Sequence, residues 1–214
     1  MLVKVCGITR PEDAVMIVEN GASGVGVIID VPVETPRKIT VEKALRIKKA
    51  LEYVPHNLIA VMMYEKPDDV LKTYGELRPH GIQLHGGESP EFVREVNENV
   101  EGFIIKTIHA TQEIDFDYVK AVSEYADMML VDTMVGGKVG GTGEVHDMSI
   151  DARVREVTGK PLMISGGLNA ANIKAALVKV RPHAVDVCSG VESSPGVKDP
   201  EKLKQFMEIV NETG

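Results

Sequence analysis

A cysteine at the end of the first apolar run is a candidate acid–base residue of this sequence. Cys6 closes the run Leu2–Cys6, and in a strand Lys4 points to the same side because side chains alternate. A nearby ammonium favours the thiolate, which is the basic form of the thiol. We therefore take Cys6 as a candidate general base, and we expect Lys4, in a network with Asp186, to lower its pKa.

Polar residues of other types follow later apolar runs. Asp132 comes after Met128–Val131 and could donate a proton as a general acid. Arg37 lies beyond the second run, and its planar guanidinium could pair with a substrate carboxylate. His85, in the segment Gln83-Leu84-His85-Gly86, is a candidate substrate contact. The sequence thus holds one candidate acid, one candidate base and two candidate binding residues.

Glycine-rich segments follow the last three apolar runs. Glycines let a backbone approach a ligand closely and direct several N–H groups at one anion, helped by the helix that follows. We therefore expect a phosphate-binding site, made by Gly141, Thr142, Gly143, Gly166, Gly167, Ser189 and Gly190.

The elements that must position these residues are short apolar strands alternating with amphipathic helices. The candidate strands are Leu2–Cys6, Gly24–Ile29, Asn57–Met62, Gly81–Leu84, Phe103–Lys106, Met128–Asp132, Leu162–Ile164 and Ala184–Val187. Their brevity and apolar character are typical of parallel strands covered on both faces. Helix starts are indicated by a capping box at Thr9-Arg10-Pro11-Glu12, by Ser89-Pro90, by Asn169 and by Asp199-Pro200.

Eight such modules in 214 residues predict one α/β domain over residues 1–214, a single (β/α)₈ TIM barrel. A doubly wound open sheet would be favoured by a Gly-x-Gly-x-x-Gly turn after the first strand. The chain has Cys6-Gly7-Ile8-Thr9 there instead. In a barrel the candidate residues meet at the carboxyl ends of the strands, where active sites of this fold lie.

Composition excludes several classes of partner. A net charge of −8 argues against binding nucleic acid or an anionic membrane surface, and no apolar run reaches the roughly 18–20 residues of a membrane span. Cys6 and Cys188 form neither a disulfide framework nor a zinc-binding spacing. We expect a cytoplasmic protein, a monomer or a homodimer, that binds a small phosphorylated molecule and needs no metal or cofactor.

Motifs along the whole chain resemble the phosphoribosylanthranilate isomerases of tryptophan biosynthesis. They are Lys4-Val5-Cys6-Gly7-Ile8-Thr9, Thr35-Pro36-Arg37, Gln83-Leu84-His85-Gly86, Gly140-Gly141-Thr142-Gly143, Gly166-Gly167-Leu168-Asn169 and Asp186-Val187-Cys188-Ser189-Gly190-Val191-Glu192, continuing through Ser194-Pro195-Gly196-Val197-Lys198-Asp199. The resemblance implies conversion of N-(5-phosphoribosyl)anthranilate to 1-(2-carboxyphenylamino)-1-deoxyribulose 5-phosphate without a cofactor. It also implies that Asp132 protonates the ribose ring oxygen, that Cys6 takes the proton from C2, and that Arg37 meets the anthranilate carboxylate.

The chain departs from the family pattern at the rim of the expected site. It lacks the usual aromatic stretch before Arg37, it carries the extra residues Val135-Gly136-Gly137-Lys138-Val139, and it has His146-Asp147-Met148 in place of Phe-Asp-Trp.

Two other functions remain open. A metal-dependent sugar-phosphate epimerase would use His85 and His109 as ligands, but the strand ends offer few further ligands. A binding module without catalysis would not need both Cys6 and Asp132.

Overall fold

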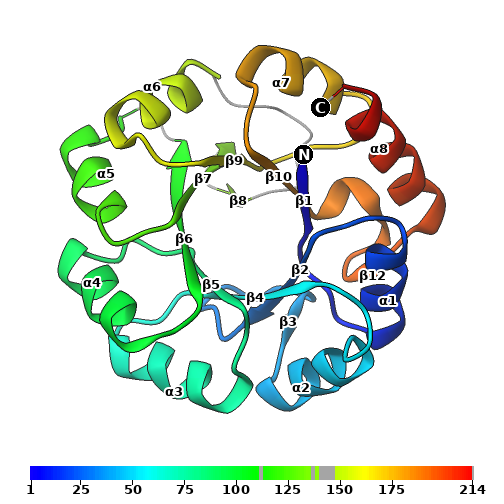
Figure 1. The fold of residues 1–214 in the computed structure, drawn as a ribbon, viewed down its shortest axis with the longest axis horizontal. Helices are drawn as coiled ribbons and strands as arrows, with labels where there is room; N and C mark the ends of the chain where they lie inside the picture. The colour runs from blue at the N-terminus through cyan, green and yellow to red at the C-terminus, as the bar shows by residue number, and fades with distance from the viewer. Residues whose placement is uncertain (111–112, 136–137, 140–147, 214) are drawn as a thin grey trace.

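Eight parallel strands close into a barrel in the computed structural model, which describes residues 1–110, 113–135, 138–139 and 148–213 (Figure 1). The barrel strands are β1 (Leu2–Val5), β2 (Gly24–Ile29), β4 (Asn57–Met62), β5 (Gly81–Leu84), β6 (Phe103–Ala110), β7 (Met128–Val135), β9 (Leu162–Ile164) and β10 (Ala184–Val187). Their order is β1-β10-β9-β7-β6-β5-β4-β2, and pairing of β1 with β2 closes the ring. The predicted (β/α)₈ fold is confirmed.

In the part of the chain that the structure describes, eight helices form the outer ring around this barrel (Figure 1). They are α1 (Pro11–Glu19), α2 (Val41–Ala50), α3 (Pro67–Leu77), α4 (Pro90–Asn99), α5 (Phe116–Ser123), α6 (Ser149–Thr158), α7 (Ile173–Val180) and α8 (Pro200–Thr213). Each presents an apolar stripe to the sheet; in α8 it consists of Leu203, Phe206, Met207 and Val210, all buried. Among the described residues, no helix is long and apolar enough to cross a membrane.

The barrel interior and the shell around it are separate packing regions. A small cluster fills the inside of the barrel with Ile59, Ile105, Leu130, Met163 and Ala184. The larger cluster lies between the strands and the helices, since alternate strand residues face outward. Between the inner cluster and the carboxyl ends of the strands, polar side chains replace apolar ones. The carboxyl-terminal end is therefore the end of the barrel where chemistry can occur.

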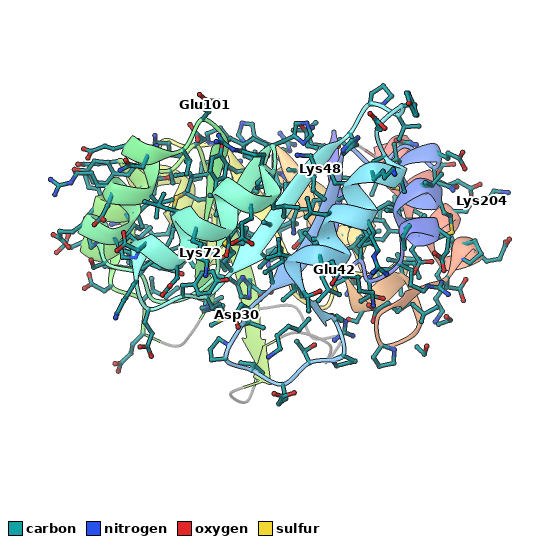
Figure 2. All side chains as sticks on the ribbon, turned by 90° about the horizontal axis from the view of Figure 1, so that it is seen from below. Asp30, Glu42, Lys48, Lys72, Glu101 and Lys204 are labelled. Atoms are coloured by element: carbon teal, nitrogen blue, oxygen red, sulfur yellow. The ribbon has the colours of Figure 1, made fainter. Side chains whose placement is uncertain are left out.

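Several short elements lie beyond the carboxyl ends of the barrel strands. Strand β3 (Lys38–Ile39) pairs with the end of β2, and β8 (Lys138–Val139) pairs antiparallel with the end of β7. The 3₁₀ turn η1 (Ser189–Val191) leads to a small hairpin of β11 (Glu192–Ser194) and β12 (Val197–Lys198). In the side view, Asp30 after β2 lies toward one end of the barrel, and Glu101 before β6 lies at the other (Figure 2).

Two of the predicted helix caps are wrong. Thr9 does not cap α1: its hydroxyl donates to the Gly196 carbonyl at 2.7 Å, and Arg10 precedes the helix without a capping bond. Asn169 does not cap α7, because the chain makes a further turn and Asn172 precedes the helix. Ser89 does cap α4, since its hydroxyl accepts a bond from the Phe92 N–H at 3.3 Å.

Strand ends also differ slightly from the predicted ones. Strand β1 ends at Val5, although the Cys6 N–H still donates to the Val187 carbonyl at 2.9 Å and so continues the ladder. Strands β6 and β7 run to Ala110 and Val135, beyond the predicted ends Lys106 and Asp132. Polar residues such as Thr107 and His109 continue β6 because they face the site rather than the apolar shell.

Candidate active site

One cavity at the carboxyl ends of the strands collects most of the predicted site residues. Of those predictions, it is lined by Cys6, Arg37, His85, Asp132, Gly166, Gly167 and Ser189. Apolar side chains form part of its wall: Ile28, Val31, Val33, Val61, Met63 and Leu168. The cavity therefore combines the candidate acid and the candidate base with a guanidinium, glycine-bearing loops and an apolar surface.

Cys6 lies beside a buried ion pair. The Lys4 ammonium contacts the Asp186 carboxylate at 2.9 Å, and both side chains are almost fully buried. Burial raises the pKa of the Cys6 thiol, and Asp186 adds to the rise, whereas Lys4 and Lys198 lower it. Lys4 thus acts in the predicted direction, but burial outweighs it and the pKa stays above its ordinary value.

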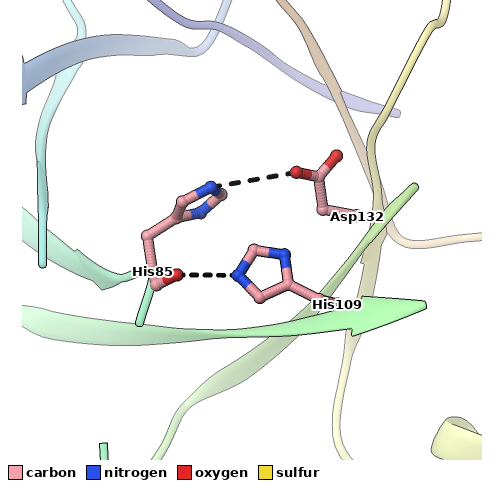
Figure 3. A group of neighbouring side chains, drawn as sticks. All are labelled: His85, His109 and Asp132. Atoms are coloured by element: carbon pink, nitrogen blue, oxygen red, sulfur yellow. Dashed lines mark hydrogen bonds and ion pairs between the residues drawn. The ribbon is translucent and has the colours of Figure 1, made fainter. Parts of the chain in front are cut away.

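Asp132 stands on β7, three strands away from β1 around the barrel, with β10 and β9 between them. Its side chain is buried, and its Oδ2 lies 3.8 Å from Nε2 of His85 (Figure 3). Burial, with the nearby charges of His109, Lys4 and Lys106, lowers the pKa of His85 to about 3. His85 is therefore neutral near pH 7. Its Nδ1 lies 3.1 Å from the Thr107 hydroxyl, which helps to fix the ring.

Arg37 is held by a carboxylate from a distant part of the chain. Its Nε and Nη2 lie 3.0 and 2.6 Å from the two carboxylate oxygens of Glu192. Lys198 contacts the same carboxylate at 2.9 Å. Burial raises the pKa of Glu192, but hydrogen bonds from Arg37 and the charge of Lys198 hold it below its ordinary value. The guanidinium is therefore fixed at the cavity wall by one of its two edges.

Apart from Ser189, which lines the cavity, the predicted phosphate-binding residues divide into three groups. Gly166 and Gly167 have positive φ angles of 88° and 67°, which side-chain-bearing residues rarely adopt, so glycine is needed for this loop. Gly190 lies behind the cavity wall, and a Cβ there would collide with the carbonyl oxygen of Leu168. Gly141, Thr142 and Gly143 fall outside the described residues.

Three polar residues near the site are not among the predicted catalytic or substrate-binding residues. Glu192 and Lys198 pair across the β11–β12 hairpin, and the Pro195-Gly196 turn between them was a signal for that hairpin. His109 lies opposite Asp132 in the β6–β7 register. The sequence named it only as a metal ligand for an alternative function, since β6 was expected to end three residues earlier.

Comparison with known proteins agrees with this geometry. Residues 3–209 match the family model of N-(5'-phosphoribosyl)anthranilate (PRA) isomerase. The chain is 37% identical to the N-(5'-phosphoribosyl)anthranilate isomerase of Methanocaldococcus jannaschii, over 97% of this chain and 96% of that protein.

Solved structures give the same result. Phosphoribosyl anthranilate isomerase from Thermotoga maritima superposes with a TM-score of 0.86 at 34% identity, covering 99% of both chains. A structure of such an isomerase in complex with reduced 1-(o-carboxyphenylamino)-1-deoxyribulose 5-phosphate gives 0.82 at 34% identity, covering 99% of this chain and 100% of that one. This chain belongs to the phosphoribosylanthranilate isomerase family.

Proposed function

We propose that this chain converts N-(5-phosphoribosyl)anthranilate to 1-(2-carboxyphenylamino)-1-deoxyribulose 5-phosphate, an isomerisation in tryptophan biosynthesis. The observation that carries the proposal is the placement of Cys6 and Asp132 on separate strands around one cavity that also contains Arg37 and the glycine loop at Gly166. Ring opening requires an acid, and removal of the C2 proton requires a base at another position. The two side chains meet that requirement.

Asp132 acts in this mechanism as the general acid. It protonates the ring oxygen of the ribose, the C1–O bond breaks, and the nitrogen lone pair forms an iminium at C1. The neutral His85 ring beside Asp132 adds no positive charge that would oppose the iminium. Cys6 then takes the proton from C2, the electron pair of the C2–H bond forms a C1–C2 double bond, and the π pair of the iminium returns to nitrogen. The resulting enolamine tautomerises to the ketone.

Arg37 binds the anthranilate carboxylate in this proposal. Glu192 occupies the Nε–Nη2 edge of the guanidinium, and no described residue bonds the Nη1–Nη2 edge. A guanidinium can pair with carboxylates at both edges. Glu192 therefore orients Arg37 without blocking it, and the apolar side chains nearby accept the aromatic ring.

The phosphate binds at the opposite end of the substrate, against the loops after β9 and β10. Positive φ at Gly166 and Gly167 turns the backbone so that consecutive N–H groups can face one anion. Remote binding of the phosphate holds the open-chain intermediate between Asp132 and Cys6. We further propose a cytoplasmic location, compatible with the free thiols of Cys6 and Cys188, and a monomer or homodimer; a related isomerase from Thermotoga maritima is described as dimeric.

The test is a turnover assay with freshly prepared phosphoribosylanthranilate. Wild type should turn over substrate, whereas Cys6→Ala and Asp132→Asn should each lose about 10²–10⁴-fold in kcat, the usual contribution of one acid or base. Full activity in either variant would remove that residue from the mechanism. Tight binding without turnover in wild type would instead identify a non-catalytic binding protein.

A further inference from the structure

Three metal-ligand side chains converge on the inner face of the barrel. His85 follows β5, His109 lies on β6 and Asp132 on β7, and these are consecutive strands (Figure 3). One ligand atom from each residue lies within 4.8 Å of the other two. His85 and Asp132 also line the main cavity, so the cluster is open to solvent and to small molecules on that side.

His109 has the arrangement of a histidine prepared to bind a metal. Its Nε2 lies 2.8 Å from the carbonyl oxygen of His85. A carbonyl only accepts, so Nε2 carries the proton and donates it, and the lone pair of the neutral ring is on Nδ1. That Nδ1 is buried and has no hydrogen-bond partner in the described part of the chain. Histidines that bind metals commonly donate their second ring N–H to a carbonyl in this way.

The spacing of the other two ligands also fits a metal. Nε2 of His85 and Oδ2 of Asp132 are 3.8 Å apart, which is too far for a hydrogen bond between them. Tetrahedral zinc with ligands at about 2.0–2.2 Å separates neighbouring ligand atoms by roughly 3.3–3.6 Å. The Nδ1 atom of His85 lies 3.1 Å from the Thr107 hydroxyl, which can accept its proton and leave Nε2 for the metal. Small side-chain shifts would bring all three into coordination range.

We propose that His85 Nε2, His109 Nδ1 and the Asp132 carboxylate form a binding site for a divalent transition metal, with Zn²⁺ as the preferred ion and the fourth position open to the cavity. Two imidazoles and one carboxylate suit Zn²⁺, whereas Mg²⁺ and Ca²⁺ prefer sites made of oxygen ligands. The sequence offered only two of these ligands for a metal. The fold adds Asp132 as the third.

Zn²⁺ in this site acts as an inhibitor rather than a cofactor. This part of the inference rests on the proposed function, in which Asp132 donates a proton to the substrate. A carboxylate that coordinates a metal cannot make that donation, and the metal occupies the place of the substrate sugar. Zn²⁺ and substrate therefore compete for the same free enzyme.

The chain contains a matched control for the histidine pair. His56 and His80 make an edge-to-face contact with ring centroids 5.2 Å apart, against 4.9 Å for His85 and His109. His56 also has a buried ring nitrogen, Nε2, without a partner among the described residues. No cluster of metal-ligand residues found in the described ranges includes His56. Its substitution thus removes a similar ring without touching the proposed site.

The primary experiment measures metal binding without substrate. Metal-stripped wild type, His109→Ala and His56→Ala are titrated with Zn²⁺ by calorimetry and with Co²⁺ by visible absorption, and circular dichroism checks the fold of each. Wild type and His56→Ala should bind one ion, and Co²⁺ should give the intense visible bands of a tetrahedral site. His109→Ala should bind at least about tenfold more weakly. Equal binding by His109→Ala, loss of binding in His56→Ala, or absence of saturable binding in wild type would overturn the site.

A second measurement separates this inference from the proposed function. Zn²⁺ should raise the apparent KM of wild type for phosphoribosylanthranilate, and His109→Ala should keep its turnover at Zn²⁺ concentrations that inhibit wild type. Metal binding in a chain without isomerase activity would refute the proposed function and leave the site standing. Isomerase activity without metal binding would refute the site alone.

Discussion

Replacement of Lys4 by Met should destabilise the protein strongly, because it leaves Asp186 as a buried carboxylate without its cation. The two charged atoms are 2.9 Å apart, with side-chain exposures of 2% and 6%. Breaking such a pair by removing one partner destabilises a protein by about 3–5 kcal/mol. In the variant, the Ser165 hydroxyl at 3.4 Å still contacts Asp186, but this contact is weak.

The loss of stability in Lys4→Met depends on pH, because the unpaired carboxylate can be neutralised by a proton. Protonation costs an ordinary aspartic acid about 4 kcal/mol at pH 7 and about 1.5 kcal/mol at pH 5. The destabilisation in Lys4→Met should therefore be near 4 kcal/mol at pH 7 and should shrink by about 2.5 kcal/mol at pH 5. Introducing Asp186→Asn into Lys4→Met should recover most of the loss at pH 7, because no charge then remains buried.

Urea unfolding of the four members of this mutant cycle measures these free energies, with Arg46→Met as the control. Arg46 pairs with Glu42 on α2, but both side chains are largely exposed, so its loss should amount to less than about 1 kcal/mol. The reasoning is wrong if Lys4→Met resembles Arg46→Met at pH 7, or if its destabilisation is the same at pH 5 and pH 7.

Three further predictions concern the site. The pH profile of Cys6 alkylation by iodoacetamide should have its midpoint above the ordinary thiol pKa of about 8.5, because burial raises the pKa of Cys6. Lys4→Met should move this midpoint higher still. A midpoint at or below the ordinary thiol pKa would contradict the prediction. The pKa of Glu192 is lowered in the folded protein, so its carboxylate stabilises the fold at pH values above its ordinary pKa. This stabilisation is lost as the pH falls through the pKa of Glu192 in the folded state. Glu192→Gln should therefore make acid unfolding less steep in fluorescence or circular dichroism titrations. Gly190→Ala should destabilise the protein by about 1–3 kcal/mol, because the new Cβ collides with the Leu168 carbonyl. In Gly75→Ala, on α3, the Cβ meets nothing within 4 Å, and the protein should be stabilised by about 0.5–1 kcal/mol. Equal shifts of Tm in the two variants would contradict this expectation.

The strand pattern was readable from sequence because each barrel strand is buried on both faces. A run such as Gly24–Ile29 is short and apolar, which is the pattern of a strand in a parallel sheet covered on both faces. The caps were harder to predict. The Thr9 hydroxyl has a partner supplied by the tertiary structure, the Gly196 carbonyl, which local sequence rules do not contain. Asn169 instead accepts from the Ala171 N–H in a turn that precedes α7.

The positions of the proposed acid and base could be predicted from the strand ends, but their electrostatics could not. Burial raises the pKa of Cys6 more than Lys4 lowers it, and only the packed structure gives the balance between the two. Likewise, Arg37 is held by Glu192, which lies 155 residues away in the chain. No spacing rule connects residues so far apart, although both stand in motifs that resemble the family.

Closure of the barrel by its first and last strands sets an order of events during synthesis. Lys4 leaves the ribosome well before its partner Asp186, which lies 182 residues later. At about 5–20 residues per second, the two charged side chains are synthesised roughly 10–35 s apart. Until Asp186 is available, β1 lacks one of its two neighbours, and the thiol on which the proposed chemistry depends lacks part of its surroundings. The active site therefore forms only after β10 has been synthesised.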